Sequence, residues 1–323
     1  MDTSASDRRK ALDHCVTRTS IQGLPEPYRG KVRDVYELDA HTLGIVTSDR
    51  ISAFDHIMKQ AIPFKGQILN RLAAFSFGKV QDLVETHVVD VPHPNVTVAK
   101  RCRPLPVEVV IRACLTGHAW RVYRDGGRTL CGVSLQEGMR ENEHFEEPIL
   151  TPATKAEEGH DEDISEADIL AQGIVEEEIW EEIRERAFAV FERGRQVAAE
   201  RGLILVDTKY EFGLFEGRPV LIDEVHTADS SRYFYAEGYR ERLEAGKPQR
   251  QLSKEFLREW LMDHGFQGRE GERLPNLPDE FRWKVYRRYA ELFETLTGEP
   301  FVPRLVEDMD AELEKLFEGW RTG

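Results

Sequence analysis

The stretch LILVDTKYEFGLFEGRPVLIDE, residues 203–224, constrains the fold of this chain more than any other. Its apolar start is followed by alternating side chains, so Asp207, Lys209 and Glu211 are expected on one face of a strand. A Glu-Gly pair supplies a turn, and the return strand brings Asp223 nearly opposite Glu211. The sequence therefore predicts a hairpin in which two carboxylates converge with a lysine between them.

Charged side chains beside apolar strands need partners. Burying an unpaired charge costs on the order of several kcal/mol. A magnesium ion that holds a polyphosphate would remove this cost, since Mg²⁺ prefers hard oxygen ligands. We therefore predict Glu211 and Asp223 as magnesium ligands, and the alternative is a solvated charged face on an edge hairpin.

Composition excludes several classes of function. The chain has 323 residues, 40% of them hydrophobic, and a formal net charge of -15, which argues against a nucleic-acid-binding surface. Four cysteines without a CxxC pair indicate reduced thiols rather than a disulfide framework. No segment approaches the length of a membrane span, and the N-terminus lacks a signal-like apolar region, so we expect a cytoplasmic protein with no membrane partner.

Two polar segments near the N-terminus suggest ligand binding. In RGKVRDVY, residues 29–36, a glycine precedes Lys31 and Arg33, which are expected to share one face of a strand that covers phosphates. An exposed basic strand face is the alternative. The loop SDRISAFD, residues 48–55, could be a capped turn or a ligand-binding loop.

A buried strand with two embedded charges follows in the middle of the chain. VEVVIR, residues 107–112, carries Glu108 and Arg112, and it leads into TGHAW, residues 116–120. The backbone N–H groups of this turn and Arg112 could hold an anion together. A plain strand-to-helix turn is the alternative.

The remaining segments predict scaffold and one long loop. The polar loop at 152–161 is interpreted as a binding loop, followed by a single helix from Ile169 to Arg201. Three C-terminal helices are expected to pack on the core or on a sister subunit, which leaves a homo-oligomer open. The predicted regions are an N-terminal arm at 1–24, an N-terminal α+β lobe at 25–106, a central α+β lobe at 107–245 and a C-terminal helical region at 246–323.

Three other classes of protein are alternatives to an enzyme with a magnesium-polyphosphate site. A kinase-like phosphotransferase should show an HRD-type catalytic loop, which the sequence lacks. A metal-dependent phosphohydrolase built on His160 and Asp161 would need further histidine ligands at a suitable spacing. A non-catalytic nucleotide-binding module shares the fold argument and would differ only in lacking turnover.

Six ordered blocks of sequence between residues 30 and 232 resemble one known family. They are GKVRDVY, SDRISAFD, KGQIL, PVEVVIR, LVDTKYEFG, and DE together with DSSR. The family is SAICAR synthetase, or phosphoribosylaminoimidazole-succinocarboxamide synthase, and LVDTKYEFG matches its signature at every position. One departure is the run Thr116-Gly117-His118, because the family motif usually ends in Thr-Gly-Ser.

The resemblance implies a complete activity and fold. It implies an ATP- and magnesium-dependent ligase that joins L-aspartate to carboxyaminoimidazole ribonucleotide through an acyl phosphate. The products are SAICAR, ADP and phosphate, in de novo purine biosynthesis. The implied fold has two α+β lobes with an antiparallel N-terminal lobe, ATP in the cleft between the lobes, and C-terminal helices.

The resemblance also implies a role for individual residues. Residues implied at the nucleotide, the metal and the reacting centre are Lys31 and Arg33 at the phosphates, Glu108 near the adenine, Glu211 and Asp223 at Mg²⁺, and Lys209 and Asp207 at the centre. Arg112 and Arg232 are implied at the ribonucleotide phosphate, and His118 and Ser231 are predicted as further substrate contacts. Further contacts to aspartate or phosphate are implied for Ser52, Asp55, Lys155, His160 and Asp161.

Overall fold

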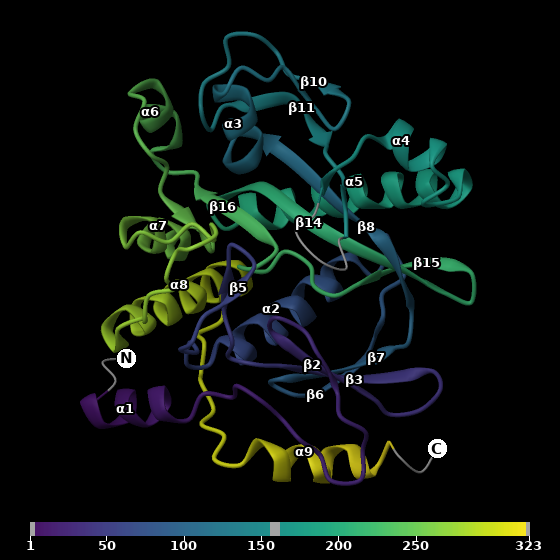
Figure 1. The fold of residues 1–323 in the computed structure, drawn as a ribbon, viewed down its shortest axis with the longest axis vertical. Helices are drawn as coiled ribbons and strands as arrows, with labels where there is room; N and C mark the ends of the chain where they lie inside the picture. Colours follow the sequence, from purple (N-terminus) through teal and green to yellow (C-terminus); the bar gives the residue numbers. More distant parts are fainter. Residues whose placement is uncertain (1–3, 156–161, 321–323) are drawn as a thin grey trace. The chain divides into compact units, whose positions relative to one another are not determined.

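A computed structural model of the chain describes residues 4–155 and 162–320 as a mixed α+β fold (Figure 1). The chain divides into two compact units. Unit 1 comprises residues 1–75, 88–101 and 253–323, and unit 2 comprises residues 76–87 and 102–252. The C-terminal helices thus group with the N-terminal sheet, while the four regions expected from the sequence stay a prediction.

Unit 1 is built on a five-stranded sheet in which every strand pair is antiparallel, as predicted for the N-terminal lobe. The strand order is β1 (Tyr28–Arg29), β2 (Arg33–Glu37), β3 (Thr42–Thr47), β7 (Val96–Lys100) and β6 (Val88–His93). A separate small hairpin is formed by β4 (Ser52–Ala53) and β5 (His56–Ile57).

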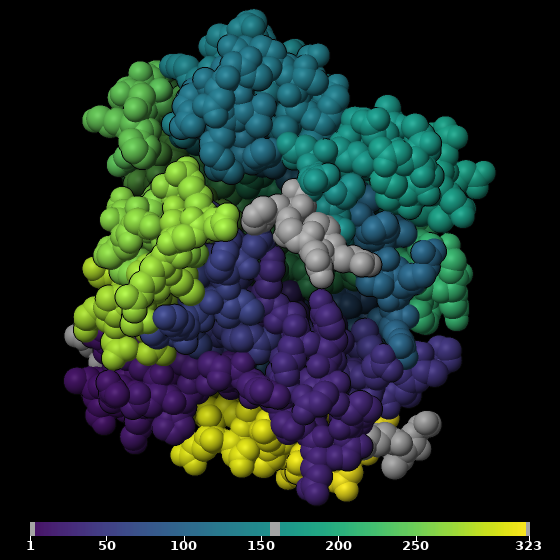
Figure 2. Space-filling model, in the orientation of Figure 1, coloured from purple at the N-terminus to yellow at the C-terminus, as the bar shows by residue number. Residues whose placement is uncertain are grey.

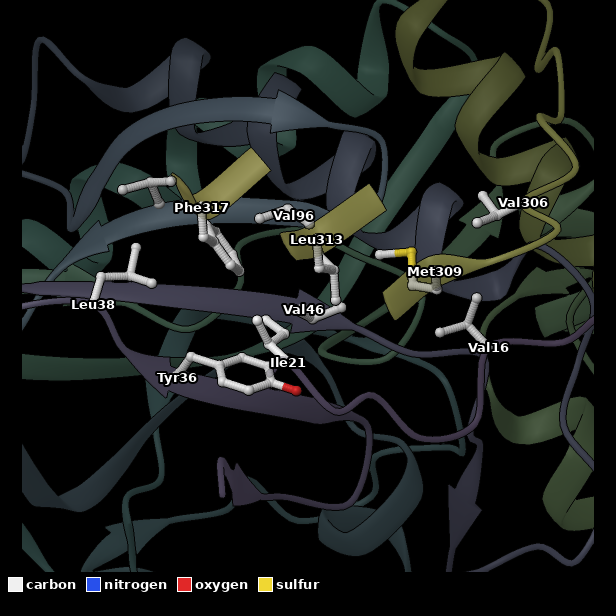
Figure 3. Packing of buried hydrophobic residues seen from close by; sticks show 11 residues of the cluster. Val16, Ile21, Tyr36, Leu38, Val46, Val96, Val306, Met309, Leu313 and Phe317 are labelled. Atoms are coloured by element: carbon white, nitrogen blue, oxygen red, sulfur yellow. The ribbon is translucent and has the colours of Figure 1, made fainter. Parts of the chain in front are cut away.

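Helix α9 (Met309–Glu318) covers the core of this sheet (Figure 3). Phe317 and Leu313 of the helix are fully buried in one cluster with Tyr36 and Val46. A Cβ at Gly44 of β3 would lie 2.6 Å from the Phe317 ring, so only glycine leaves room for it. Figure 2 shows α9, in yellow, directly beside the purple N-terminal segment, and two hydrogen bonds of 2.9 and 3.1 Å join them.

Three further helices and part of a fourth belong to the described residues of unit 1. They are α1 (Ala5–Asp13), α7 (Glu255–Asp263) and α8 (Asp279–Thr297), while α2 (Lys65–Val80) begins in unit 1 and ends in unit 2. The buried Arg282 of α8 donates to the carbonyl oxygens of Ala61 and Leu12 at 2.8 and 3.0 Å. This contact fixes α8 against the end of α1.

Unit 2 is built on an eight-stranded sheet that contains the predicted hairpin. The path runs β13 (Glu162–Asp163), β12 (Ala153–Thr154), β8 (Arg103–Cys114), β14 (Leu203–Phe215), β16 (Ser231–Tyr235) and β17 (Gln251–Leu252), with β11 (His144–Leu150) on β8 and β15 (Arg218–Ile222) on β14. Glu216 and Gly217 both have positive φ, 52° and 80°, which is the two-residue turn that hairpins favour. A second, two-stranded sheet pairs β9 (Thr129–Leu130) with β10 (Val133–Ser134).

The helices of unit 2 correct one prediction. The single helix expected from Ile169 to Arg201 is wrong, because the chain forms α4 (Glu166–Ala171) and α5 (Glu177–Ala199) instead. Gly173 has φ 65° and ends the first of them. Helices α3 (Gly117–Arg124) and α6 (Tyr239–Glu244) complete the unit, and α5 packs on β14 and β8. In the described part of the chain, no helix is both long and apolar enough to cross a membrane.

Candidate active site

Strand pairing in unit 2 gathers the predicted charges on one face of the sheet. In the register of β8 and β14, Asp207 lies opposite Arg112 and Glu211 lies opposite Glu108. Asp207 also lies opposite Arg232 of β16. Side chains of paired antiparallel residues point to the same face. We call this set the charged strip, and its members are Glu108, Arg112, Asp207, Lys209, Glu211 and Arg232.

At one end of the charged strip a lysine lies between two carboxylates. The Lys209 ammonium donates to Glu108 Oε1 at 2.5 Å and to Glu211 Oε1 at 3.0 Å. The Lys155 ammonium donates to the other oxygen of Glu211. Burial would lower the pKa of Lys209, but Glu211, Glu108 and Asp223 outweigh it and raise that pKa above its ordinary value. Lys209 is therefore a fixed positive charge at neutral pH.

The pKa of Glu211 is shifted in the opposite direction to that of Lys209. Burial would raise the pKa of this carboxyl, but the ammonium groups of Lys209 and Lys155 hold it below its usual range. The carboxylate is thus ionised at neutral pH. Its oxygens keep lone pairs for a further cation, because a carboxylate offers about four acceptor positions.

At the other end of the charged strip two arginines share one carboxylate. Asp207 Oδ2 lies 3.3 Å from Arg112 Nη1 and 3.4 Å from Arg232 Nη1. Arg112 Nε donates to Thr151 Oγ1 at 2.9 Å, and Arg232 Nη1 donates to Thr116 Oγ1 at 3.1 Å. Two guanidinium groups against one carboxylate leave a net positive charge, which suits an anion such as phosphate.

The turn before α3 is shaped around one of these arginines. Gly117 has φ 56°, a conformation that residues with side chains rarely adopt. A Cβ at this position would lie 2.6 Å from Arg232 Nη1. Glycine therefore lets the guanidinium lie against the backbone of the turn.

Three predicted residues of unit 2 lie off the charged strip. The ring of His118 contacts Asp163 Oδ2 at 2.6 Å, with both side chains about two-fifths exposed at 41% and 43%. The hydroxyl of Ser231 is 2.7 Å from that of Thr208 on the opposite face of the sheet. Asp223 follows β15, and because Glu211 pairs with Ile222, it lies one residue beyond the position opposite Glu211.

In unit 1, Lys31 and Arg33 do not lie on one strand as predicted. Gly30 N donates to Arg33 O at 2.8 Å, which closes a tight turn between β1 and β2. Lys31 is at the tip of this turn, so the prediction that it shares a strand face with Arg33 is wrong. The Lys31 side chain pairs with Asp55. Arg50 holds the turn by donating to Lys31 O at 3.3 Å and to Gly30 O at 3.0 Å.

The SDRISAFD segment supplies β4 and the turn of the small β4–β5 hairpin. Ser52 is buried in β4, while Phe54 and Asp55 form the turn with φ 51° and 61°. Such a turn usually takes glycine, asparagine or aspartate, so the bulky Phe54 strains the backbone here, which often marks a ligand-binding segment. Among the other predicted residues, His160 and Asp161 lie outside the described residues.

Sequence reasoning missed the side chains that hold the two arginines in place. Thr116 lies in the turn before α3, and Thr151 is the residue that follows β11. From these positions their hydroxyls reach the arginines of the charged strip. Within residues 4–155 and 162–320, no three His, Cys, Asp or Glu residues are grouped so as to hold a metal by themselves. A metal at Glu211 and Asp223 would thus need further oxygen ligands from a substrate or from water.

The charged strip has the chemistry of an enzyme that acts on anionic, phosphate-bearing substrates. A sequence profile of SAICAR synthetase matches residues 26–273. Phosphoribosylaminoimidazole-succinocarboxamide synthase of Bacteroides thetaiotaomicron is 50% identical over 93% of this chain and 96% of its own length. The Cytophaga hutchinsonii protein of that name is 52% identical over 88% of this chain and 92% of its own.

Solved structures agree with the sequence comparisons. SAICAR synthase from Saccharomyces cerevisiae, complexed with SAICAR, has a TM-score of 0.77 and 35% identity over 89% of this chain and 100% of its own. A type-2 SAICAR synthetase in complex with ADP has a TM-score of 0.66 and 25% identity over 86% of this chain and 100% of its own. The chain belongs to the SAICAR synthetase family. Its activity is that of an ATP-dependent ligase of purine biosynthesis.

Proposed function

We propose that the charged strip is the place where L-aspartate is joined to the carboxylate of carboxyaminoimidazole ribonucleotide. The observation that carries this proposal is the convergence of Glu108, Lys209 and Glu211 at one end and Arg112 with Arg232 at the other. One end suits a metal-bound polyphosphate, and the other suits a phosphate monoester. A substrate with both a reacting carboxylate and a phosphate can use both ends.

The ribonucleotide phosphate is assigned to the arginine end. Arg112 and Arg232 are held by hydroxyls and by Asp207, so their guanidinium groups are already oriented when an anion arrives. Preorganised donors lose little entropy on binding. Asp207 then acts by positioning both arginines. His118 and Ser231, predicted to bind substrate as well, contact Asp163 and Thr208 here, so a direct role for them requires a change of partner.

Magnesium is assigned to Glu211 and Asp223. The two carboxylates fit this ion in type and number, because Mg²⁺ commonly takes one or two carboxylates and completes its shell with phosphates and water. The lysine contacts of Glu211 do not prevent this, since each carboxylate oxygen has a second lone pair. When bound, the ion would neutralise charge on the transferring phosphoryl group.

The chemistry needs positioning more than proton transfer. A carboxylate oxygen of the ribonucleotide attacks the γ-phosphorus of ATP, the bond to ADP breaks, and an acyl phosphate forms. The aspartate amine then attacks the acyl carbon, phosphate leaves, and the proton released by the nitrogen passes to the departing phosphate or to water. Lys209 stays protonated, so its proposed role is to stabilise negative charge on the phosphoryl oxygens and the leaving phosphate.

Other predicted contacts are proposed at the nucleotide and at aspartate. Lys31 and Arg33 are assigned to the ATP phosphates, supported by a turn that Arg50 holds in place. Glu108, which the resemblance implies near the adenine, is proposed instead at the polyphosphate end, because it contacts Lys209. Contacts to aspartate or phosphate are proposed for Ser52, Asp55, Lys155, His160 and Asp161. The cytoplasmic location and a homo-oligomer stay predictions.

The test is the substrate dependence of ADP release by the full chain. ADP should appear only when ATP, Mg²⁺, L-aspartate and carboxyaminoimidazole ribonucleotide are all present. For the arginine end, Arg232→Lys should raise the KM for the ribonucleotide at least about tenfold, because one flexible ammonium replaces a fixed fork of donors. An unchanged ribonucleotide KM would remove the phosphate from this end. ADP release at an equal rate without aspartate would contradict the ligase reaction.

A further inference from the structure

A buried histidine lies behind the charged strip, on the face of the sheet that α5 covers. His226 Nε2 is 2.6 Å from the hydroxyl of Tyr210, and both side chains are buried. Tyr210 lies on β14 between Lys209 and Glu211, so its side chain points away from the charged strip. The mechanism proposed above uses neither residue.

This hydrogen bond connects two segments that carry the proposed metal ligands. Tyr210 is next to Glu211 in β14, and His226 is three residues after Asp223 in the segment 223–230, which we call the 223–230 loop. Tyr233 donates to the carbonyl oxygen of His226 at 2.9 Å. The loop is thus attached by His226 to the back of the strands that present the charged strip.

The backbone of the 223–230 loop adopts left-handed conformations at Asp223 and at His226. Asp223 has φ 65° and His226 has φ 55°, and neither is glycine. Such conformations are uncommon for residues with side chains, although Asp and His adopt them more readily than most, and here the contacts of His226 hold the loop in place. The side chain of Asp223 therefore has its direction set by how the loop is held.

Helix α5 leaves room for the histidine. A Cβ at Gly194 would lie 2.3 Å from Cε1 and 2.6 Å from Nε2 of His226. Gly194 is inside a helix of ordinary backbone, where alanine would be the better helix former. The need to leave space for the imidazole of His226 thus explains why α5 has a glycine at position 194, where helix propensity alone would favour alanine.

We propose that His226 is a positioning residue for the metal site, which fixes Asp223 relative to Glu211 through its hydrogen bond to Tyr210. The proposal rests on the proposed function, because it takes Glu211 and Asp223 as the magnesium ligands. It assigns to the buried face of the LVDTKYEFG strand a role in metal affinity. A purely structural role would lower stability and leave the affinity for the metal unchanged.

The first experiment removes only the hydroxyl, with Tyr210→Phe in the full chain. We expect the affinity of the enzyme for Mn²⁺ in the presence of ADP, measured by electron paramagnetic resonance of free Mn²⁺, to fall about tenfold. The concentration of Mg²⁺ for half-maximal turnover should rise to match, while the KM for aspartate stays the same. The control is Tyr123→Phe, which removes another buried hydroxyl, bonded to Gln136 O at 3.0 Å. Unchanged Mn²⁺ affinity in Tyr210→Phe overturns the proposal.

A second pair of variants approaches the histidine from α5. Gly194→Ala forces the imidazole to move, whereas Gly78→Ala, in α2, meets no other atom within 4 Å. We expect weaker Mn²⁺ binding in Gly194→Ala alone. If the two alanine variants bind Mn²⁺ equally well, the position of the ring does not control the metal site, and the proposal fails.

Asp223→Asn separates this inference from the proposed function. If Asp223→Asn leaves Mn²⁺ binding unchanged, the metal assignment is wrong, and the inference falls with it. If Asp223→Asn weakens Mn²⁺ binding but Tyr210→Phe does not, only the inference is wrong. If both weaken it, the double variant should bind no more weakly than Asp223→Asn, because the hydroxyl acts through that carboxylate. Fully additive losses would contradict this route.

Discussion

Lowering the pH should destabilise the folded chain through His226. Burial lowers the pKa of this imidazole from 6.5 to about 3. Its neighbour Tyr210 is also buried, and burial raises the pKa of that phenol well above its ordinary value, so the hydrogen-bonded pair is neutral on both sides. In the unfolded chain the histidine binds a proton near pH 6.5, but in the folded chain it does not until about pH 3. The proton therefore favours the unfolded state, and stability present above pH 6.5 is lost as the pH falls.

The size of this effect follows from linkage. At pH 5 the unfolded histidine is almost fully protonated and the folded one is neutral, which favours unfolding by about 2 kcal/mol relative to pH 8. The value hardly depends on the folded pKa, because any value below about 4 gives the same result at pH 5. The pKa values of His93 and His144 are also lowered, chiefly by burial, so they add to the pH dependence of the whole protein.

The assay is urea unfolding at pH 5, 6, 7 and 8 for the chain and for His226→Gln. The variant lacks the titrating group, and the other histidines contribute equally in both proteins. The free energy of unfolding should therefore fall by about 2 kcal/mol more in the chain than in His226→Gln between pH 8 and pH 5. The variant is expected to be less stable at pH 8, which does not enter the comparison. Equal falls in the two proteins would show that the imidazole is charged or solvated in the folded state.

Three further predictions concern the proposed site. Glu211→Gln and Asp223→Asn should each lower turnover at least about a hundredfold while the thermal midpoint of unfolding stays nearly the same. Added Mg²⁺ should restore turnover only partly. Steady-state ADP release measures this, and a near-normal rate at ordinary Mg²⁺ would contradict the metal assignment. Lys31→Ala should raise the KM for ATP about tenfold and leave that for aspartate unchanged, since one charge-assisted contact is lost. Gly117→Ala should raise the KM for the ribonucleotide, because the added Cβ would lie only 2.6 Å from Arg232 Nη1 and would push the guanidinium aside. An unaltered KM in a ribonucleotide titration would contradict this.

Local signals explain which parts of the fold could be predicted. The β14–β15 hairpin depends on alternation and on a turn within about twenty residues, and both can be recognised in sequence. The same alternation led to a wrong prediction at Lys31 and Arg33. A four-residue segment has the same order of polar and apolar residues whether it forms a tight turn or continues a strand. Only the hydrogen bond from Gly30 N to Arg33 O, at 2.8 Å, distinguishes them.

Long-range packing explains most of what could not be predicted. The room that Gly44 leaves for Phe317 joins residues far apart in sequence, and no local pattern announces it. In the same way, the arginine end of the charged strip forms only when β16 and β8 pair on either side of β14. The break between α4 and α5 had a local signal in Gly173, but the apolar spacing on both sides of it favoured one continuous helix.

Strand geometry divides the family blocks into two kinds of residue that a match of sequence alone does not separate. In DSSR, Arg232 points to the charged strip, while Ser231 contacts Thr208 on the opposite, buried face. In LVDTKYEFG, Lys209 and Glu211 belong to the strip, while Tyr210 contacts the 223–230 loop. Because successive side chains of a strand point to opposite faces, each block contributes both to the chemistry and to the support behind it. A block that resembles a family therefore carries a role over to single residues only when the face of each residue is known.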